Sequence, residues 1–225
     1  PFVSSDFKRR IRATTEFGLQ YNYQMRPEFT RIVASAGWSY KWGVQQQRSQ
    51  HRIDLLDINY LYMPSIDQTF KEDYLEKDEN YILKYNYEDR FIVRTGYSYI
   101  YNSAGRALMN NSGIGNSYTI RLNFESAGNL LYAVAKLGGM KKNASGEYTL
   151  LNIPFAQYLK GDFDFAKNLV IDNRNSLAFH FGAGIAIPYG NATMLPFEKR
   201  YFSGGANSVR GWSVRDLGPG SFPGD

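Results

Sequence analysis

Residues 197–221 read FEKRYFSGGANSVRGWSVRDLGPGS, and this stretch decides how the rest of the chain is interpreted. It combines two adjacent glycines, an Arg-Gly-Trp triplet and a Leu-Gly-Pro-Gly turn, without the periodicity of a helix or a strand. Glycine permits sharp turns and close backbone approach. A long loop of this kind is usually functional or disordered, and disordered segments are poor in aromatic residues. Because aromatic residues alternate with the glycines here, the sequence predicts an ordered, packed loop.

The composition excludes several classes of protein. The apolar runs are much shorter than the roughly 20 residues that a membrane-spanning helix needs, and the mean hydropathy is -0.44. This hydropathy test does not detect the strands of a membrane barrel, because lipid-facing and interior residues alternate along them. The 18 Tyr, 15 Phe and 3 Trp agree with the aromatic girdles that such a barrel has at both membrane interfaces. The absence of cysteine excludes disulfide frameworks and thiolate sites. The net charge of +5 comes without a dense basic patch, so nucleic-acid binding is not expected.

Alternation of apolar and polar residues predicts seven strands. The clearest runs over 11–26, where every second residue is apolar for about 15 residues, which is long for a globular strand. The sixth candidate is irregular, and the seventh has an unusually small polar face. The predicted strands cover 11–26, 31–44, 51–62, 91–102, 117–125, 153–165 and 176–187.

Each predicted strand has one apolar and one polar face, because successive side chains point to opposite sides. The residues expected to face lipid are Tyr21, Trp38, Tyr97, Phe124 and Phe181, and those expected to face the interior are Arg12, Gln20, Arg94, Arg121 and Asp164. Val33, Leu55 and Leu61 break the pattern. In the loops, Phe70, Tyr74 and Lys77, and likewise Leu130, Val134 and Leu137, have the spacing of short surface helices.

The glycine-rich stretch resembles the signature loop of the BamA/TamA superfamily of outer-membrane β-barrels, which includes the two-partner-secretion transporters. The residues that carry the resemblance are Glu198, Phe202, Gly204, Gly205, Val209, Arg210, Gly211 and Trp212. With LGPGS following, the string looks closest to the TamA-like (TamL) branch of Bacteroidota-type bacteria. The resemblance therefore implies an all-β fold, namely part of a transmembrane antiparallel up-and-down barrel.

The family barrel has about sixteen strands, so the resemblance implies that these seven are a contiguous piece of it, with two open edges. Residues 1–187 would form barrel strands with long outer loops at 63–90 and 126–147. Residues 188–225 would form the signature loop, inserted into the barrel lumen and truncated at Asp225.

Arg210 is the residue to which the resemblance assigns the central structural role. A guanidinium has five donors in a rigid fork, so it can pin a returning loop to carboxylates and carbonyls of the barrel wall. The candidate lumen partners of Arg210 in this chain are Glu16, Glu125, Asp162 and Asp164. In relatives, the partner residues lie mostly on strands beyond this segment.

The resemblance implies an outer-membrane assembly or translocation factor for β-rich client proteins, of the TamA-like kind. A BamA-type insertase and a two-partner-secretion exporter remain alternatives, as does a barrel enzyme such as a lipase or protease. No nucleophile–histidine pair favours the enzyme, and two distant histidines, His51 and His180, favour no metal site. No cofactor is expected. The expected partners are client outer-membrane or secreted proteins, the lipid bilayer and a possible inner-membrane or periplasmic assembly partner.

Overall fold

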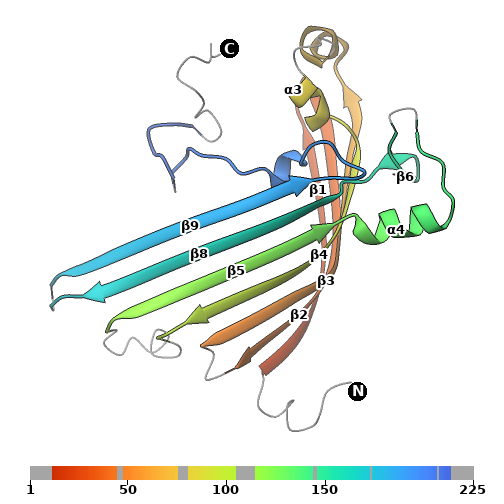
Figure 1. Ribbon diagram of the computed structural model, residues 1–225. Helices are drawn as coiled ribbons and strands as arrows, with labels where there is room; N and C mark the ends of the chain where they lie inside the picture. Colours follow the sequence, from red (N-terminus) through yellow and green to blue (C-terminus); the bar gives the residue numbers. More distant parts are fainter. Residues whose placement is uncertain are drawn as a thin grey trace. The chain divides into compact units, whose positions relative to one another are not determined.

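The computed structural model describes residues 12–44, 48–75, 81–104, 115–143, 146–172, 174–206 and 208–213. The chain divides into two units, Pro1–Leu195 and Pro196–Asp225. The first unit is a single large antiparallel sheet with short helices and a small hairpin at one end of its strands (Figure 1). The second contains a 3-10 turn, η4 (Phe197–Lys199), and the glycine-rich segment.

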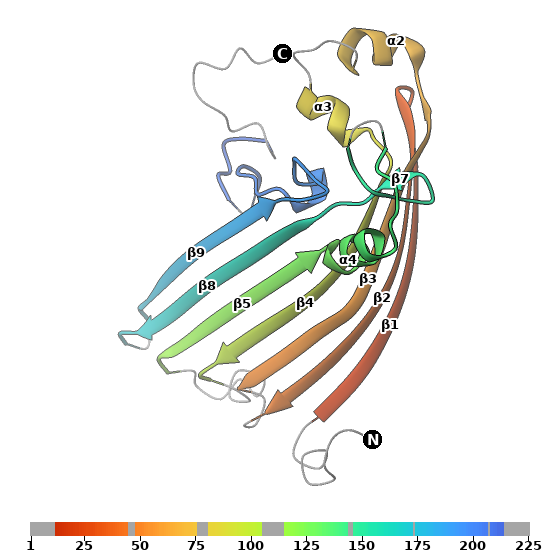
Figure 2. The same cartoon turned by 45° about the vertical axis from the view of Figure 1, so that its right-hand side comes forward.

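Seven strands form the sheet, in the order β1-β2-β3-β4-β5-β8-β9. Their bounds are β1 Arg12–Met25, β2 Phe29–Val44, β3 Ser49–Ile66, β4 Arg90–Asn102, β5 Ser117–Ala127, β8 Tyr158–Val170 and β9 Ser176–Pro188. Each strand pairs antiparallel with its neighbour in the sheet. The sheet curves and remains open, with β1 and β9 as its edges among the described residues (Figure 2). The predicted all-β fold with two open edges is confirmed.

The strand register places the charged residues on one side of the sheet, the polar face, and most large hydrophobic residues on the other, the apolar face. The polar face contains Gln20, Arg94, Arg121 and Asp164. The backbone of Arg12 pairs with Gly43, which places Arg12 at a position of the same face. Tyr21, Trp38, Tyr97, Phe124 and Phe181 all belong to the apolar face. The predicted separation of these two sets is therefore confirmed.

Aromatic side chains line both ends of the apolar face. At the end with the β2–β3 turn, Trp42 stacks on His51 with ring centroids 5.0 Å apart, and Tyr97 contacts Nδ1 of His51 through its hydroxyl at 2.8 Å. At the opposite end, the Tyr60 and Phe91 rings stack 4.8 Å apart. Aromatic residues gathered on one face of the sheet are typical of the outer surface of a membrane barrel.

A bulge in β3 explains one break in the sequence pattern. Asp54 pairs with Gly96 and Asp57 pairs with Arg94, so β3 uses three residues where β4 uses two. An extra residue shifts the alternation and lets two acids three positions apart share a face. The two other breaks in the pattern are Val33 and Leu61. These two apolar residues pair with each other on the polar face, so each lies beside an apolar neighbour.

The sixth predicted strand, 153–165, lies several residues too early. The structure has β8 at Tyr158–Val170. The strand continues because Ala166 and Asn168 pair with both β5 and β9. Residues 153–154 instead form β7, which pairs with β6 (Thr149–Leu150) in a small hairpin. Within β8, Phe163 and Phe165 alternate with Asp162 and Asp164.

Short helices fill the two long connections that join β3 to β4 and β5 to β8. The first contains α2 (Gln68–Phe70), a π-helical turn η1 (Lys71–Leu75) and α3 (Tyr81–Asn86), and the second contains α4 (Asn129–Leu137). Leu130, Val134 and Leu137 lie on α4 as their spacing predicts, whereas Lys77 lies outside the described residues. None of the helices in the described ranges is long and apolar enough to cross a membrane.

Candidate functional site

Arg94 is the centre of a cluster of charged residues on the polar face. Its Nη1 lies 2.9 Å from Glu125 Oε2 and 3.6 Å from Asp54 Oδ2, and its Nη2 pairs with Asp57. The guanidinium side chain is 19% exposed. A rigid fork of donors can satisfy several carboxylates at once, so one arginine joins strands β3, β4 and β5.

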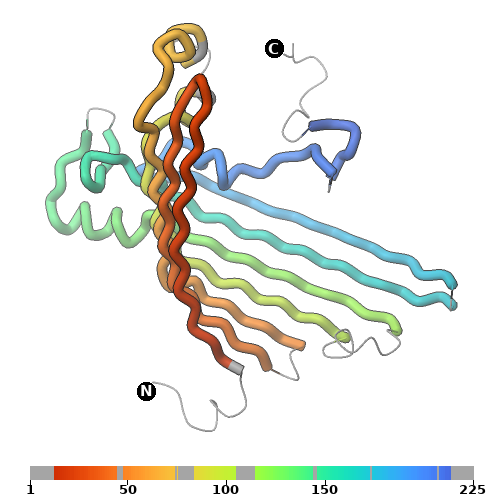
Figure 3. The backbone as a smooth tube through the Cα atoms, turned by 180° about the vertical axis from the view of Figure 1, so that it is seen from behind, coloured from red at the N-terminus to blue at the C-terminus, as the bar shows by residue number. Residues whose placement is uncertain are grey.

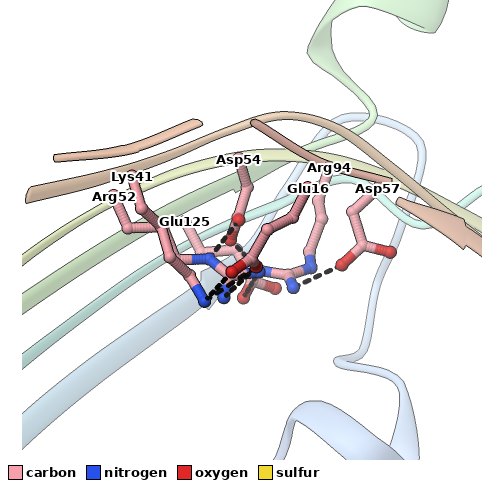
Figure 4. A network of polar contacts seen from close by, with 7 residues as sticks. All are labelled: Glu16, Lys41, Arg52, Asp54, Asp57, Arg94 and Glu125. Atoms are coloured by element: carbon pink, nitrogen blue, oxygen red, sulfur yellow. Dashed lines mark hydrogen bonds and ion pairs between the residues drawn. The ribbon is translucent and has the colours of Figure 1, made fainter. Parts of the chain in front are cut away.

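The cluster extends across β1 and β2 (Figure 4). Lys41 Nζ lies 2.7 Å from Glu16 Oε2, and Arg52 Nε lies 2.6 Å from Asp54 Oδ1. Figure 4 shows that the side chains project from the same side of the sheet. We call this set the Arg94 cluster; it contains Glu16, Lys41, Arg52, Asp54, Asp57, Arg94 and Glu125. Cations and carboxylates alternate in it, so the charges largely compensate one another.

The Arg94 cluster is buried on one side and open on the other. Tyr158 is fully buried, and its hydroxyl donates a hydrogen bond to Glu125 Oε1. Tyr158 also packs with Ile92, Ala127 and Ala156 in the largest apolar cluster of buried residues. On the opposite side, a pocket of about 320 Å³ extends over Gly18 and Gly37, where no side chain fills the surface.

A second charged group occupies the polar face where β5, β8 and β9 meet. Asp164 pairs with Nε2 of His180 and lies 3.9 Å from Arg121 Nη1. We call these three residues the Arg121 group. Its arginine and histidine side chains are 57% and 66% exposed. His180 therefore lies among polar groups of this face.

The glycine-rich segment closes on itself within the second unit. The backbone N–H of Gly205 donates to the carbonyl oxygen of Trp212 at 2.8 Å. Two tighter turns lie inside this closure, from Gly205 to Ser208 and from Val209 to Trp212. Gly204 and Gly205 have φ angles of 99° and 90°, a region that other residues rarely adopt, so this turn requires the glycine pair.

Arg210 is exposed at this turn, and its Nε donates to the carbonyl oxygen of Ala206 at 3.1 Å. Glu198 belongs to η4, and Phe202, Val209 and Trp212 are exposed. The continuation LGPGS lies outside the described residues. Docking of Arg210 onto the sheet stays a prediction.

The predicted partners of Arg210 all lie on the polar face, on three different strands. Glu16 and Glu125 belong to the Arg94 cluster, and Asp164 belongs to the Arg121 group. Asp162 lies on β8 opposite Asn123 and Gly184. The structure therefore brings these acids to one face but gives at least three of them other cationic neighbours.

Sequence reasoning missed Arg94 as a centre and Tyr158 as its support. Arg94 was recognisable as an interior residue of β4, but its three acids come from two other strands, and two of them share a face only because of the bulge in β3. Tyr158 fell in the irregular part of the sixth predicted strand. Finding Tyr158 would have required the pairing register of β8 with both β5 and β9.

The described residues contain no group of three or more His, Asp or Glu side chains placed to hold a metal ion. The polar face presents fixed arginines, lysines and carboxylates that form ion pairs and hydrogen bonds. Such a surface can orient a polar segment.

Comparison with known proteins identifies the family. No curated protein and no solved structure matched the chain. The Omp85 superfamily domain, by contrast, matches residues 4–225. An open antiparallel sheet with one charged and one aromatic-rich face agrees with part of a membrane barrel. The chain therefore belongs to the Omp85 superfamily, the BamA/TamA family of outer-membrane β-barrels that insert or translocate proteins.

Proposed function

We propose that this chain is part of a TamA-like factor that inserts or exports β-rich client proteins at the outer membrane, and that Arg210 holds its glycine-rich turn inside the barrel. The observation that carries the proposal is the closed turn from Gly205 to Trp212, which presents an exposed arginine. Its Nε is oriented by Ala206, and this contact leaves the two Nη groups for an external acceptor.

The polar face offers suitable acceptors for such a guanidinium. Asp162 and Asp164 alternate along β8, and their partners on β9 are Gly184 and Gly182. Glycines leave space above the sheet for a second segment. Because of these glycines we favour the two acids as the partners of Arg210 over Glu16 and Glu125, which pair with Lys41 and Arg94. Asp164 would then share its carboxylate between Arg210 and the exposed His180.

The first experiment replaces Arg210 with Ala in the full-length protein, with Arg210→Lys as the matched control. A hydrogen bond to a charged group contributes about 1.5–3 kcal/mol, so the Ala variant should shift the docked turn toward the undocked state by roughly tenfold or more. Protease cleavage within 197–213 should accelerate, and client levels in the outer membrane should fall. Lys retains the charge without the fork, so its effect should be smaller.

The same experiment distinguishes the docking from the cellular role. Asp162→Asn and Asp164→Asn, each combined with Arg210→Ala, should show non-additive effects on protease cleavage for the true partner. An Arg210→Ala protein with wild-type cleavage and wild-type client levels contradicts the proposal.

Depletion of the full-length protein tests the TamA-like assignment itself. Loss of a subset of outer-membrane proteins supports a TamA-like factor. General loss of outer-membrane proteins would instead indicate a BamA-type insertase, and failure to secrete one large partner would indicate a two-partner-secretion exporter. Quantitative proteomics of isolated outer membranes and of the culture medium separates these three results.

A further inference from the structure

Helix α4 carries an exposed apolar stripe formed by Leu130, Val134 and Leu137. Leu130 is 66% exposed, Val134 57% and Leu137 89%. These positions recur every three or four residues, so they lie on one side of the helix. Ala135, on the other side, is buried at 2%. A stripe of large hydrophobic residues turned outward marks a surface that interacts with an apolar partner.

The orientation of α4 is fixed by contacts on its opposite side. Gly128 immediately precedes the helix with a φ angle of 72°, and a Cβ there would lie 2.2 Å from the carbonyl oxygen of Ala156. Asn129 bonds to both Ser126 and Gln157. The Tyr132 ring packs edge-on against Tyr148 at 5.4 Å, beside the β6–β7 hairpin. The exposed stripe is therefore held in place rather than left to rotate.

The helix lies on the apolar side of the sheet. It begins directly after β5, at the end of the strands where β9 also ends. In Figure 3 it extends outward from the back of the curved sheet, and in Figure 4 it lies on the side opposite the Arg94 cluster. The helix thus lies on the same side of the sheet as the apolar face, which contacts lipid in a barrel of this superfamily.

The charge of this segment matches a membrane surface. Residues 128–143 contain Lys136, Lys141 and Lys142 and no acidic residue. All three lysines are exposed. An amphipathic helix with a basic flank binds at the boundary between lipid headgroups and acyl chains, where apolar side chains enter the lipid and cations meet phosphate groups.

We propose that α4 is an interfacial helix that inserts Leu130, Val134 and Leu137 into the bilayer beside the barrel, with its lysines at the phosphate groups. The helix would fix the depth and tilt of this part of the wall in the membrane. This proposal uses the membrane location of the superfamily but is independent of Arg210 and of the client. It holds for an insertase, a translocase or an exporter alike.

The test places a fluorescent probe on α4 of the full-length protein, with any cysteine elsewhere replaced by serine. The 225 residues contain none, so Leu137→Cys labelled with an environment-sensitive dye reports from a single site. In vesicles of phosphatidylethanolamine and phosphatidylglycerol, we expect emission at shorter wavelength and strong quenching by lipids with spin-labelled acyl chains. Lys136→Cys, an exposed neighbour off the stripe, is the control and should report the more polar headgroup region, with emission at longer wavelength and weaker quenching.

A second variant tests whether the dye itself, rather than the apolar stripe, partitions into the lipid. Val134→Cys carries the dye, and Leu130→Ser with Leu137→Ser removes the stripe around it. The double substitution should abolish the spectral shift at position 134 while heat-modifiable migration of the folded barrel stays unchanged. Equal spectra for dyes at 136 and 137 would overturn the proposal. So would a shift that depends on protein concentration and resists lipid quenchers, because a second copy of the chain would then cover the stripe.

Discussion

Two arginines on the same face of the same sheet have very different surroundings. Arg94 contacts three carboxylates and is 19% exposed, whereas Arg121 approaches one carboxylate at 3.9 Å and is 57% exposed. Both belong to strands with the same alternation of polar and apolar residues. We expect the charges of the polar face to hold the strands together most strongly where the sheet and its neighbours exclude water from them.

The difference has a local cause in packing. Tyr158 covers the Arg94 cluster on one side, together with the small apolar core at the end of β4, β5 and β8. The strand that borders the Arg121 group is β9, which contributes Gly182 and Gly184 to this face. Small residues leave water free access to the ions, and hydrated ion pairs contribute little to stability.

Arg94→Ala should produce the largest loss of stability. The substitution leaves Asp54, Asp57 and Glu125 facing one another without their cation, and breaking a buried ion pair typically costs about 3–5 kcal/mol. Because some water reaches the cluster, we expect about 3 kcal/mol in the free energy of unfolding. Urea unfolding in detergent micelles measures it. Arg94→Lys is the control and should lose less, because Lys keeps the charge; equal losses would show that the fork geometry, and not the charge alone, is what matters.

Tyr158→Phe should have an intermediate effect. The buried Glu125 loses a hydroxyl donor while the ring stays in place, and an unsatisfied buried partner costs about 1–3 kcal/mol. The same unfolding assay measures this loss. Tyr21→Phe, on an exposed tyrosine of the apolar face, is the matched control and should change little. A neutral Tyr158→Phe would mean that water replaces the hydroxyl, which would weaken the contrast drawn between the two arginines.

Arg121→Ala should have the smallest effect, about 0–1 kcal/mol, as for other exposed ion pairs. Raising the salt concentration should reduce even that difference, because exposed charges are screened. Unfolding of wild type and variant at two ionic strengths provides the measurement. A loss of unfolding free energy as large as that of Arg94→Ala would contradict the difference drawn between the two arginines. It would mean that Arg121 has a further partner.

Most of the sheet was predictable because alternation is a local property. The first strand, expected at 11–26, is observed at Arg12–Met25, and the last, expected at 176–187, is observed at Ser176–Pro188. Each residue reveals its face through its own polarity and that of its two neighbours. The glycine-rich signature was equally local, and it pointed to the family that the domain match shows.

The failures occurred where partners far apart in sequence decide the structure. The predicted sixth strand began too early because Ile153 and Phe155 look like strand residues, yet Phe155 is buried at the rim and Asn191 binds its carbonyl oxygen at 3.0 Å. The bulge in β3 was visible only as a misplaced Leu55. Its consequence, two acids on one face, depends on pairing with β4.

The sequence by itself determined the class of fold, the two faces of each strand and the family signature, because these follow from periodicity and from backbone requirements of nearby residues. The tertiary structure alone decided which acids surround Arg94, that Tyr158 supports them and that the apolar stripe of α4 points away from its own unit. Those features depend on register across several strands and on contacts between segments more than twenty residues apart, such as Asn129 with Gln157. Neither is encoded in any single stretch of the chain.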